Sequence, residues 1–201
     1  MTTRTPALPG IHTVEEFFDR QTCELIKDEM RAGQHERARV FDRDWENRED
    51  AGYRSTLRVK VGEGVNALVT GRLLDVRETL GRHFDVALSD CQPPTYLIYK
   101  PGDFFEAHKD DSRKPEAPEF IRGRQVSAVV FLSDEDAGDG RGEYAGGSLG
   151  FYGLLKDPRC AHIGIPVKGR AGLLVAFRSD VFHQVTPVTR GERFTIVSWY
   201  V

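Results

Sequence analysis

Three side chains in this sequence, those of His108, Asp110 and His183, could together hold a metal ion. If residues 104–110 form a strand, His108 and Asp110 lie on the same face, because side chains two positions apart in a strand point the same way. His183 lies in a second strand-like stretch, residues 181–185. Three protein ligands leave positions on the ion free to bind and activate other molecules, whereas a structural zinc site is closed by four. The residue types therefore predict a catalytic metal site.

The identity of the metal and of its carboxylate ligand follows from the same residues. Two histidines and one carboxylate are the ligand set typical of non-haem iron(II) oxygenases, so we expect the metal to be iron(II). Asp111 is a second candidate for the carboxylate. Strand parity places Asp111 on the face opposite His108, which favours Asp110.

After residue 90 the sequence changes to short apolar stretches separated by turns, a pattern that predicts antiparallel strands. We place the strands near residues 95–99, 104–110, 125–133, 148–152, 162–167, 173–177, 181–185 and 193–200. This arrangement suits a double-stranded β-helix, a jelly-roll-like and cupin-like core. The length fits one domain, residues 1–201, in which residues 1–90 form a helical support region and residues 91–201 form the core. The expected fold class is α+β.

The first of two bracing helices is expected within residues 14–33. Two start signals compete for it: Thr13 with Glu16 as a capping box, and Asp19 as a later N-cap after a short strand. In either case Gly33 ends the helix.

The second bracing helix is expected over residues 65–84, where apolar side chains recur at helical spacing. Residues 55–61 alternate enough to predict a strand. The highly charged residues 34–54 predict an irregular excursion.

Several stretches of the second half carry polar residues and glycines at fixed places between apolar residues. They are Tyr99-Lys-Pro-Gly, His108-Lys-Asp110, Arg124-Gln-Val-Ser-Ala-Val-Val-Phe-Leu, Gly146-Gly147-Ser-Leu-Gly-Phe-Tyr, His183-Gln-Val-Thr-Pro and Arg193-Phe-Thr-Ile-Val-Ser-Trp. Their order and spacing resemble the catalytic domain of the 2-oxoglutarate- and Fe(II)-dependent dioxygenases. Within that superfamily the chain is most similar to the prolyl-4-hydroxylase-like branch, which includes bacterial relatives of the hypoxia-sensing prolyl hydroxylases. The resemblance favours Asp19 as the N-cap of the first helix.

The resemblance implies roles for further residues. Arg193 would anchor the distal carboxylate of 2-oxoglutarate, because a guanidinium offers a two-pronged donor and is costly to bury without an anionic partner. Arg190 competes for this role, but it lies in a turn-like stretch. Tyr99 matches the tyrosine whose hydroxyl reaches the same carboxylate, and Tyr96 lies on the other face of that strand. Arg124 matches a position near the mouth of the site that helps receive substrate.

The activity that the resemblance implies is hydroxylation of an unactivated C–H bond, with succinate and CO2 as co-products. Iron(II) would be the cofactor, 2-oxoglutarate and dioxygen the co-substrates, and ascorbate a candidate reductant. The branch favours a prolyl residue of a polypeptide as substrate, and a free amino acid or natural-product intermediate is the alternative. A non-catalytic metal-dependent binding or sensing module is the alternative of another class. Residues 112–123 and 134–146 are expected to form a lid, because long loops in compact domains are often functional.

Composition argues against several partners. A formal net charge of −3 gives no global attraction to nucleic acid or anionic lipid. No window approaches the roughly 18 consecutive apolar residues of a membrane span. Cys23, Cys91 and Cys160 are an odd number of cysteines with no close pair, which suggests reduced thiols and a cytoplasmic location.

Overall fold

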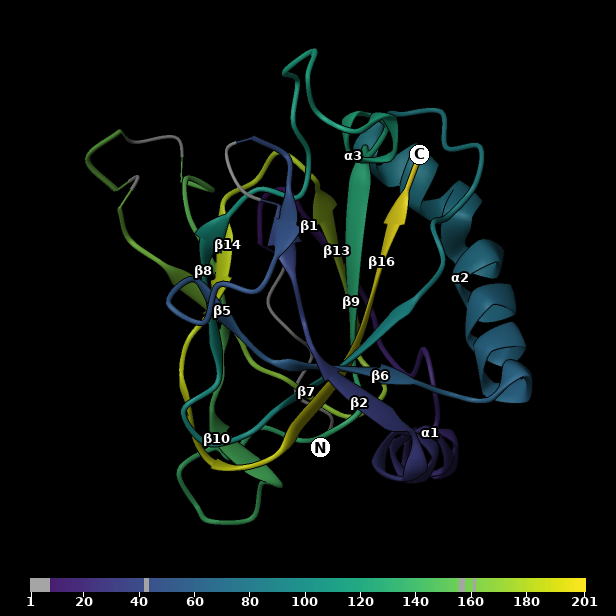
Figure 1. Cartoon of the computed structure of the whole chain (residues 1–201), viewed down its shortest axis with the longest axis vertical. Helices are drawn as coiled ribbons and strands as arrows, with labels where there is room; N and C mark the ends of the chain where they lie inside the picture. The colour runs from purple at the N-terminus through teal and green to yellow at the C-terminus, as the bar shows by residue number, and fades with distance from the viewer. Residues whose placement is uncertain (1–7, 42–43, 156–157, 161) are drawn as a thin grey trace.

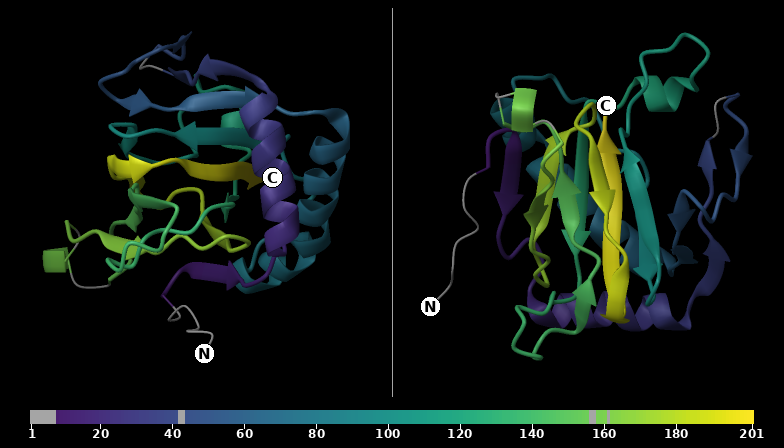
Figure 2. Two further views of the ribbon diagram at one scale, coloured as in Figure 1. Left: turned by 90° about the horizontal axis from the view of Figure 1, so that it is seen from below. Right: turned by 90° about the vertical axis from the view of Figure 1, so that its left-hand side faces the viewer.

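The computed structural model has a large antiparallel sheet with two helices on one side and a smaller antiparallel sheet on the other (Figure 1). It describes residues 8–41, 44–155, 158–160 and 162–201. Figure 2 shows both helices, α1 (Arg20–Ala32) and α2 (Glu63–Phe84), along the same side of the large sheet. The predicted combination of N-terminal helices with an antiparallel sheet is confirmed.

The strands form two main sheets and two short pairs. The large sheet has seven strands in the order β1 (Ile11–Val14), β13 (Leu174–Arg178), β9 (Val126–Phe131), β16 (Arg193–Tyr200), β7 (Thr95–Tyr99), β6 (Leu57–Lys60) and β2 (Gln34–Arg37). The smaller sheet has five, in the order β12 (Ile165–Val167), β11 (Leu149–Phe151), β14 (His183–Val185), β8 (Phe104–His108) and β5 (Arg54–Ser55). The pairs are β3 (Val40–Phe41) with β4 (Asn47–Arg48), and β10 (Tyr144–Gly146) with β15 (Val188–Gly191).

Local chemistry sets both ends of α1. The Asp19 side chain accepts a hydrogen bond of 2.7 Å from the backbone N–H of Thr22, which satisfies a donor that the first helical turn leaves free. The later of the two predicted start signals is therefore the one used. Gly33 ends the helix in an extended conformation, and a Cβ at this position would lie 2.2 Å from the Lys60 carbonyl oxygen. The glycine is needed there for close approach to β6.

The second long helix, α2, has the predicted amphipathic stripe, and Val69 and Leu73 are buried against the large sheet. A short helix, α3 (Glu119–Arg122), precedes β9, and residues Pro158–Cys160 form one 3-10 turn. Within the described residues, no helix combines the length and the apolar character needed to cross a membrane.

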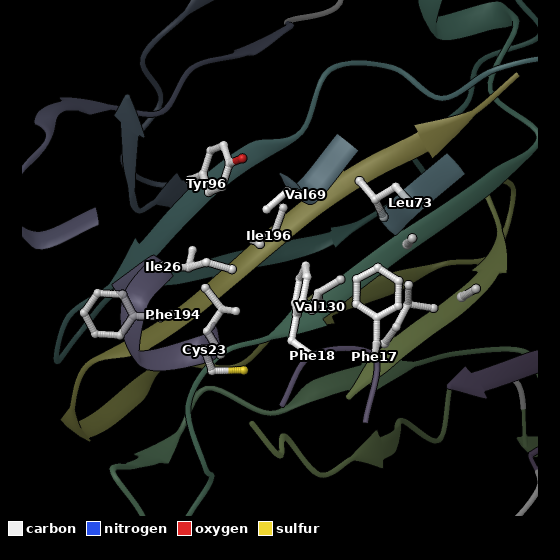
Figure 3. Packing of buried hydrophobic residues seen from close by; sticks show 14 of the residues in the cluster. Phe17, Phe18, Cys23, Ile26, Val69, Leu73, Tyr96, Val130, Phe194 and Ile196 are labelled. Atoms are coloured by element: carbon white, nitrogen blue, oxygen red, sulfur yellow. The ribbon is translucent and has the colours of Figure 1, made fainter. Parts of the chain in front are cut away.

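Side chains along the central strands alternate between the two faces of the large sheet, and each face packs in a different cluster. On β7, Tyr96 and Ile98 pack in the cluster that includes the helices, whereas Leu97 and Tyr99 pack with Val185 of the smaller sheet. Figure 3 shows the helix-facing cluster, in which side chains of α1 and α2 meet those of the strands. The labelled members are Phe17, Phe18, Cys23, Ile26, Val69, Leu73, Tyr96, Val130, Phe194 and Ile196. This face is mostly apolar, and the hydroxyl groups of Tyr96 and Tyr200 on it donate hydrogen bonds to α2. Polar side chains on the opposite face of the same strands are therefore the candidates for chemistry.

The region from residue 34 to residue 61 differs from the prediction. The segment expected to be irregular contains β2, β3, β4 and the start of β5. The single strand expected over residues 55–61 is divided between β5 in the smaller sheet and β6 in the large sheet. The division falls at Thr56, which is buried and donates through Oγ1 to the Ile98 carbonyl at 2.9 Å. The chain therefore crosses from one sheet to the other at this residue.

Candidate metal and co-substrate site

Three predicted ligands meet between the two sheets. His108 is the last residue of β8 and His183 is the first residue of β14, and the two are direct partners in the antiparallel register. Their ring centroids are 4.3 Å apart. Asp110 completes the group, and one ligand atom from each residue lies within 4.8 Å of the other two. The donor types and their convergence fit an iron(II) ion.

Asp110 reaches the group by a route that differs from the prediction. The strand that was expected to run to residue 110 ends at His108, so strand parity does not orient the carboxylate. Instead, the backbone N–H of Asp110 donates to the Ser179 carbonyl at 3.0 Å. Its Oδ1 lies 3.6 Å from His108 Nε2, and its Oδ2 lies 3.5 Å from His183 Nε2. The rival carboxylate of Asp111 lies outside the group and pairs with an arginine, Arg113, whose Nε is 3.1 Å away.

Both histidines present Nε2 to the site. His108 Nδ1 lies 2.7 Å from the Glu106 carbonyl oxygen, and His183 Nδ1 lies 3.1 Å from the Val181 carbonyl oxygen. A carbonyl oxygen only accepts, so each Nδ1 must carry the proton and donate it. The tautomer that remains has a lone pair on Nε2, the state that a metal ligand requires.

Electrostatics also prepares the group for a cation. Burial by itself would raise the pKa of Asp110, but the neighbouring His183 and His108 outweigh burial and hold this pKa well below its ordinary value. Burial lowers the pKa of His183 to about 4, with a further contribution from His108. Near neutral pH the carboxylate is charged and His183 is neutral, which leaves lone pairs available for a metal ion.

Arg193 opens β16 and is 1% exposed. Its Nη1 donates to Thr195 Oγ1 at 3.2 Å, while its Nε and Nη2 are buried with no hydrogen-bond partner. Buried donors are almost always paired, so two unpaired N–H groups on one buried guanidinium point to an anion that completes them. Their fork geometry fits a carboxylate. Arg193 lines the same cavity as the metal ligands, so the residues present fit 2-oxoglutarate.

The two tyrosines lie on opposite faces of β7, as predicted. Tyr99 is 2% exposed and is the register partner of Arg193, whose guanidinium carbon lies 4.9 Å from the Tyr99 ring centroid. Tyr96 faces the helices, where its hydroxyl donates to Asn66 Oδ1 at 3.3 Å. Of these two tyrosines, Tyr99 is therefore the one beside the predicted anchor.

Arg190 lies in a strand, β15, although its neighbourhood was predicted to be a turn. Gly191, which suggested the turn, has a positive φ of 71° and ends the strand. The Arg190 side chain nevertheless points outward as expected. Its Nη2 lies 2.6 Å from Asp136 Oδ2, and half of the side chain is exposed.

Arg124 lies against the metal group. Its Nη1 donates to the Asp110 carbonyl at 3.1 Å and its Nε donates to Gln92 Oε1 at 3.0 Å. The guanidinium carbon also lies 3.7 Å from the Trp199 ring centroid. Burial lowers the Arg124 pKa to about 10, with Asp110 acting in the opposite direction, so the group stays charged at neutral pH.

The sequence analysis did not identify two further residues near the site. Tyr144 is fully buried beside Arg193, and its hydroxyl has no hydrogen-bond partner. Arg54 lies 4.5 Å from the Phe105 ring centroid, and the Phe105 ring stacks on His108 with centroids 3.6 Å apart. Tyr144 comes shortly before the Gly146-Gly147 motif, which could have drawn attention to it. Nothing distinguishes Arg54 from the other arginines of its charged segment.

A cavity of about 1440 Å³ connects the metal ligands, Arg193, Tyr99, Arg124 and Arg54 to the surface. Its walls include residues 36–41 and 47–50 from the segment that was predicted to be an irregular excursion. Ser112, Lys114, Phe120 and Ile121, from the first of the two predicted lid loops, also line it.

The second predicted lid loop, residues 134–146, does not cover the cavity, although Tyr144 near its end packs beside Arg193. None of its residues lines the cavity, and Figure 1 shows β10 at the opposite end of the molecule from α3. The Asp136 carboxylate accepts from the backbone N–H groups of Gly138, Asp139 and Gly140 at 2.8–3.1 Å, and it pairs with Arg190. Its acidic and glycine-rich composition therefore forms a compact turn, and the prediction of a lid is wrong for this loop.

Comparison with known proteins adds an independent line of evidence. Residues 94–201 match the family described as the 2OG-Fe(II) oxygenase superfamily. A PKHD-type hydroxylase of Rhizorhabdus wittichii is 33% identical over 108 residues, which are 53% of this chain and 42% of the relative. A PKHD-type hydroxylase of Shewanella oneidensis is 31% identical over 141 residues, which are 70% of this chain and 54% of the relative. The chain thus spans about half the length of these curated relatives.

Solved structures share the fold. A prolyl-4-hydroxylase of Pseudomonas putida superposes with a TM-score of 0.70 at 23% identity, covering 96% of this chain and 92% of that one. A prolyl hydroxylase from Trichoplax adhaerens, in complex with a peptide fragment of the hypoxia inducible factor oxygen degradation domain, superposes with a TM-score of 0.71 at 18% identity. That match covers 96% of this chain and 83% of the other. At these identities the likeness concerns the fold.

Proposed function

Because the chain belongs to the 2OG-Fe(II) oxygenase superfamily, we propose that it is an iron(II)- and 2-oxoglutarate-dependent hydroxylase. One observation carries the proposal. The cavity that holds the His108, Asp110 and His183 ligand atoms also holds Arg193, a buried guanidinium with two N–H groups that have no partner. A metal-binding module without a co-substrate would have no use for that costly arginine.

Each residue has a part in this proposal. His108, Asp110 and His183 hold the ion and fix its orientation, aided by the carbonyl groups that bind both Nδ1 atoms. Arg193 binds the distal carboxylate of 2-oxoglutarate, and Tyr99 packs beside it. Iron(II) bound here with 2-oxoglutarate and dioxygen supplies the oxidising chemistry that converts a C–H bond to C–OH, with succinate and CO2 as co-products. The surrounding apolar side chains keep bulk water away from that chemistry.

The proposed substrate is a prolyl residue of a polypeptide. The solved structures that share the fold include a prolyl-4-hydroxylase and a prolyl hydroxylase in complex with a peptide. The cavity also extends well beyond the co-substrate region, through walls that include Trp45 and Phe120. We assign the role of receiving the substrate to Arg124, and its contacts with Asp110 and Trp199 beside the metal group support this role.

We further propose that residues 1–201 work as one catalytic domain, whose core over residues 91–201 is a double-stranded β-helix. Support comes from α1 and α2, which pack on one face of the large sheet while the other face carries Arg193 and Tyr99. The N-terminal region also contributes β5 and β6 to the two sheets. It therefore supplies walls of the site as well as support.

Succinate release from 2-oxoglutarate under air tests the proposal. The purified protein with Fe(II) should release succinate, at a higher rate with a prolyl peptide present, and ascorbate should prolong turnover. Asp110→Ala should abolish release, whereas Arg190→Gln should retain it, because Arg190 pairs with Asp136 on the outside. Absence of succinate from protein shown to contain iron would contradict the proposed activity.

A further inference from the structure

Arg54 is a half-buried cation that the proposed roles leave unused. It lies on β5, at the edge of the smaller sheet, and lines the same cavity as the metal ligands. Its Nε is buried without a hydrogen-bond partner, and its Nη1 makes one long contact of 3.4 Å with the Arg39 carbonyl oxygen. Among the described residues no carboxylate forms an ion pair with Arg54. A guanidinium in this state lacks the anion that would complete it.

The position of Arg54 relative to the metal group is fixed by stacked rings. The guanidinium lies over Phe105, and Phe105 stacks on His108 at an interplanar angle of 20°. Burial lowers the pKa of Arg54, while Tyr99, which also interacts with it through a side-chain hydrogen bond, and Asp110 act against this lowering. Only the Phe105 side chain would then separate an anion bound to Arg54 from His108, in a cavity whose walls include residues 36–41 and 47–50.

The charges around the metal leave room for an anionic substrate. Arg54, Arg124 and Arg193 each bring a positive charge to the cavity, and Asp110 is the carboxylate among the metal ligands. The divalent ion adds two further positive charges, and 2-oxoglutarate brings two negative charges, one of them for Arg193. The cavity, which opens to the surface, is lined by nine arginine and lysine side chains and five carboxylates, so positive charge remains in excess and favours a further anion.

We propose that Arg54 anchors a carboxylate of the prime substrate. The inference rests on the proposed function. It states that the substrate of the proposed hydroxylase carries a carboxylate close to the carbon atom that is hydroxylated. In a polypeptide the carboxylate could belong to an acidic side chain next to the target residue or to a free chain end. Both sources present the same planar two-oxygen group to the guanidinium fork.

Three blocked dipeptides distinguish the two sources of the carboxylate, and they also show whether binding requires a carboxylate at all. They are acetyl-prolyl-glutamate amide, with a side-chain carboxylate, acetyl-prolyl-glutamine with a free chain end, and acetyl-prolyl-glutamine amide, with neither. Binding is measured by calorimetry on protein loaded with Zn(II), which does not support turnover, and saturated with 2-oxoglutarate. One or both of the charged dipeptides should bind about 10- to 100-fold more tightly than the neutral one, as expected for a charged hydrogen-bonded pair.

Two variants locate the effect. Arg54→Gln should remove the advantage of the charged dipeptides while leaving 2-oxoglutarate binding within about twofold. Arg82→Gln, on the outer face of α2, is the matched control and should bind all ligands as the wild type does. If Arg54→Gln fails to fold, Arg54→Lys keeps the charge but loses the fork and should retain only part of the advantage.

The outcomes separate clearly. Preference for the side-chain acid or for the free chain end supports the inference and identifies the source of the carboxylate. Equal binding of all three dipeptides, absence of binding by all of them to protein that binds 2-oxoglutarate, or an undiminished preference in Arg54→Gln overturns it. Failure of 2-oxoglutarate itself to bind contradicts the proposed function, and the inference falls with it.

Discussion

Replacing Arg193 with methionine should have opposite effects on co-substrate binding and on the stability of the ligand-free protein. Methionine keeps an unbranched stem of similar length but removes the charge and every N–H donor. Truncating one partner of a buried charged pair typically costs about 2–5 kcal/mol, which corresponds to a loss of roughly 30- to 5000-fold in affinity for 2-oxoglutarate. The upper part of that range applies because Arg193 is 1% exposed.

Without ligand, the same substitution should stabilise the fold. Arg193 Nε and Nη2 are buried without partners, and each unsatisfied buried group costs on the order of 1–3 kcal/mol. Methionine removes both unpaired donors. It also removes the 3.2 Å hydrogen bond that Arg193 donates to Thr195. The net gain should be about 1–3 kcal/mol, and each kcal/mol corresponds to roughly 2–4 °C in Tm for a domain of this size.

The assay is thermal unfolding in Zn(II) with and without 2-oxoglutarate, together with calorimetric titration of 2-oxoglutarate. The variant should melt higher than the wild type without ligand and gain no further stability when 2-oxoglutarate is added. Arg190→Gln, with its exposed pair to Asp136, should match the wild type in both measurements. If Arg193→Met melted lower without ligand and still bound 2-oxoglutarate, the unpaired N–H groups would not be the co-substrate anchor.

Three further predictions concern the metal group and the packing of glycines. His183→Ala should abolish the rise in Tm that a divalent metal produces, whereas Asp111→Asn should keep it, and equal loss in both variants would refute the choice of carboxylate. Because burial lowers the pKa of His183 from 6.5 to about 4, the unfolded chain binds a proton that the folded protein excludes. The metal-free protein should therefore lose stability as pH falls from about 6.5 to about 4. A urea concentration at the unfolding midpoint that stays constant over this pH range would contradict the lowered pKa of His183. Gly33→Ala should destabilise by about 1–3 kcal/mol, because its Cβ would meet the Lys60 carbonyl, while Gly71→Ala in α2 should stabilise by about 0.5–1 kcal/mol. Denaturant titration compares them, and a stable Gly33 variant would show that β6 can move aside.

The residues with the strongest chemistry could be predicted from the sequence because their types are uncommon and their order is distinctive. The argument for Asp110 reached a residue that does join the group, but strand parity was the wrong reason. The strand ends at His108, and a backbone hydrogen bond to Ser179 sets the approach of Asp110. A contact between residues distant in the sequence leaves no local pattern, so parity could not have revealed it.

The walls of the cavity were harder to predict than its centre. A strand that faces a polar cavity shows no alternation of apolar and polar residues, which is why β2 to β4 were expected to be irregular. At residues 134–146 the composition predicted a mobile loop, whereas the structure has an ordered one. There the aspartates and glycines, which suggested mobility, form a turn around Asp136. Aspartates and glycines occur both in mobile loops and in compact turns. The hydrogen-bond partners of these residues in the folded protein determine which of the two forms.

The segment between β2 and β6 is a detour that begins and ends at neighbouring points of the same sheet. Arg37 at the end of β2 is the register partner of Leu57 at the start of β6. Everything between them, including β3, β4 and Arg54, can change in length or sequence while the two strands that frame it stay paired. On the proposed roles, Arg54 lies in this segment, whereas the metal ligands and Arg193 lie outside it. Transplanting this detour between related chains should transfer substrate preference as a unit, and its evolution can proceed without disturbing the hydrophobic core.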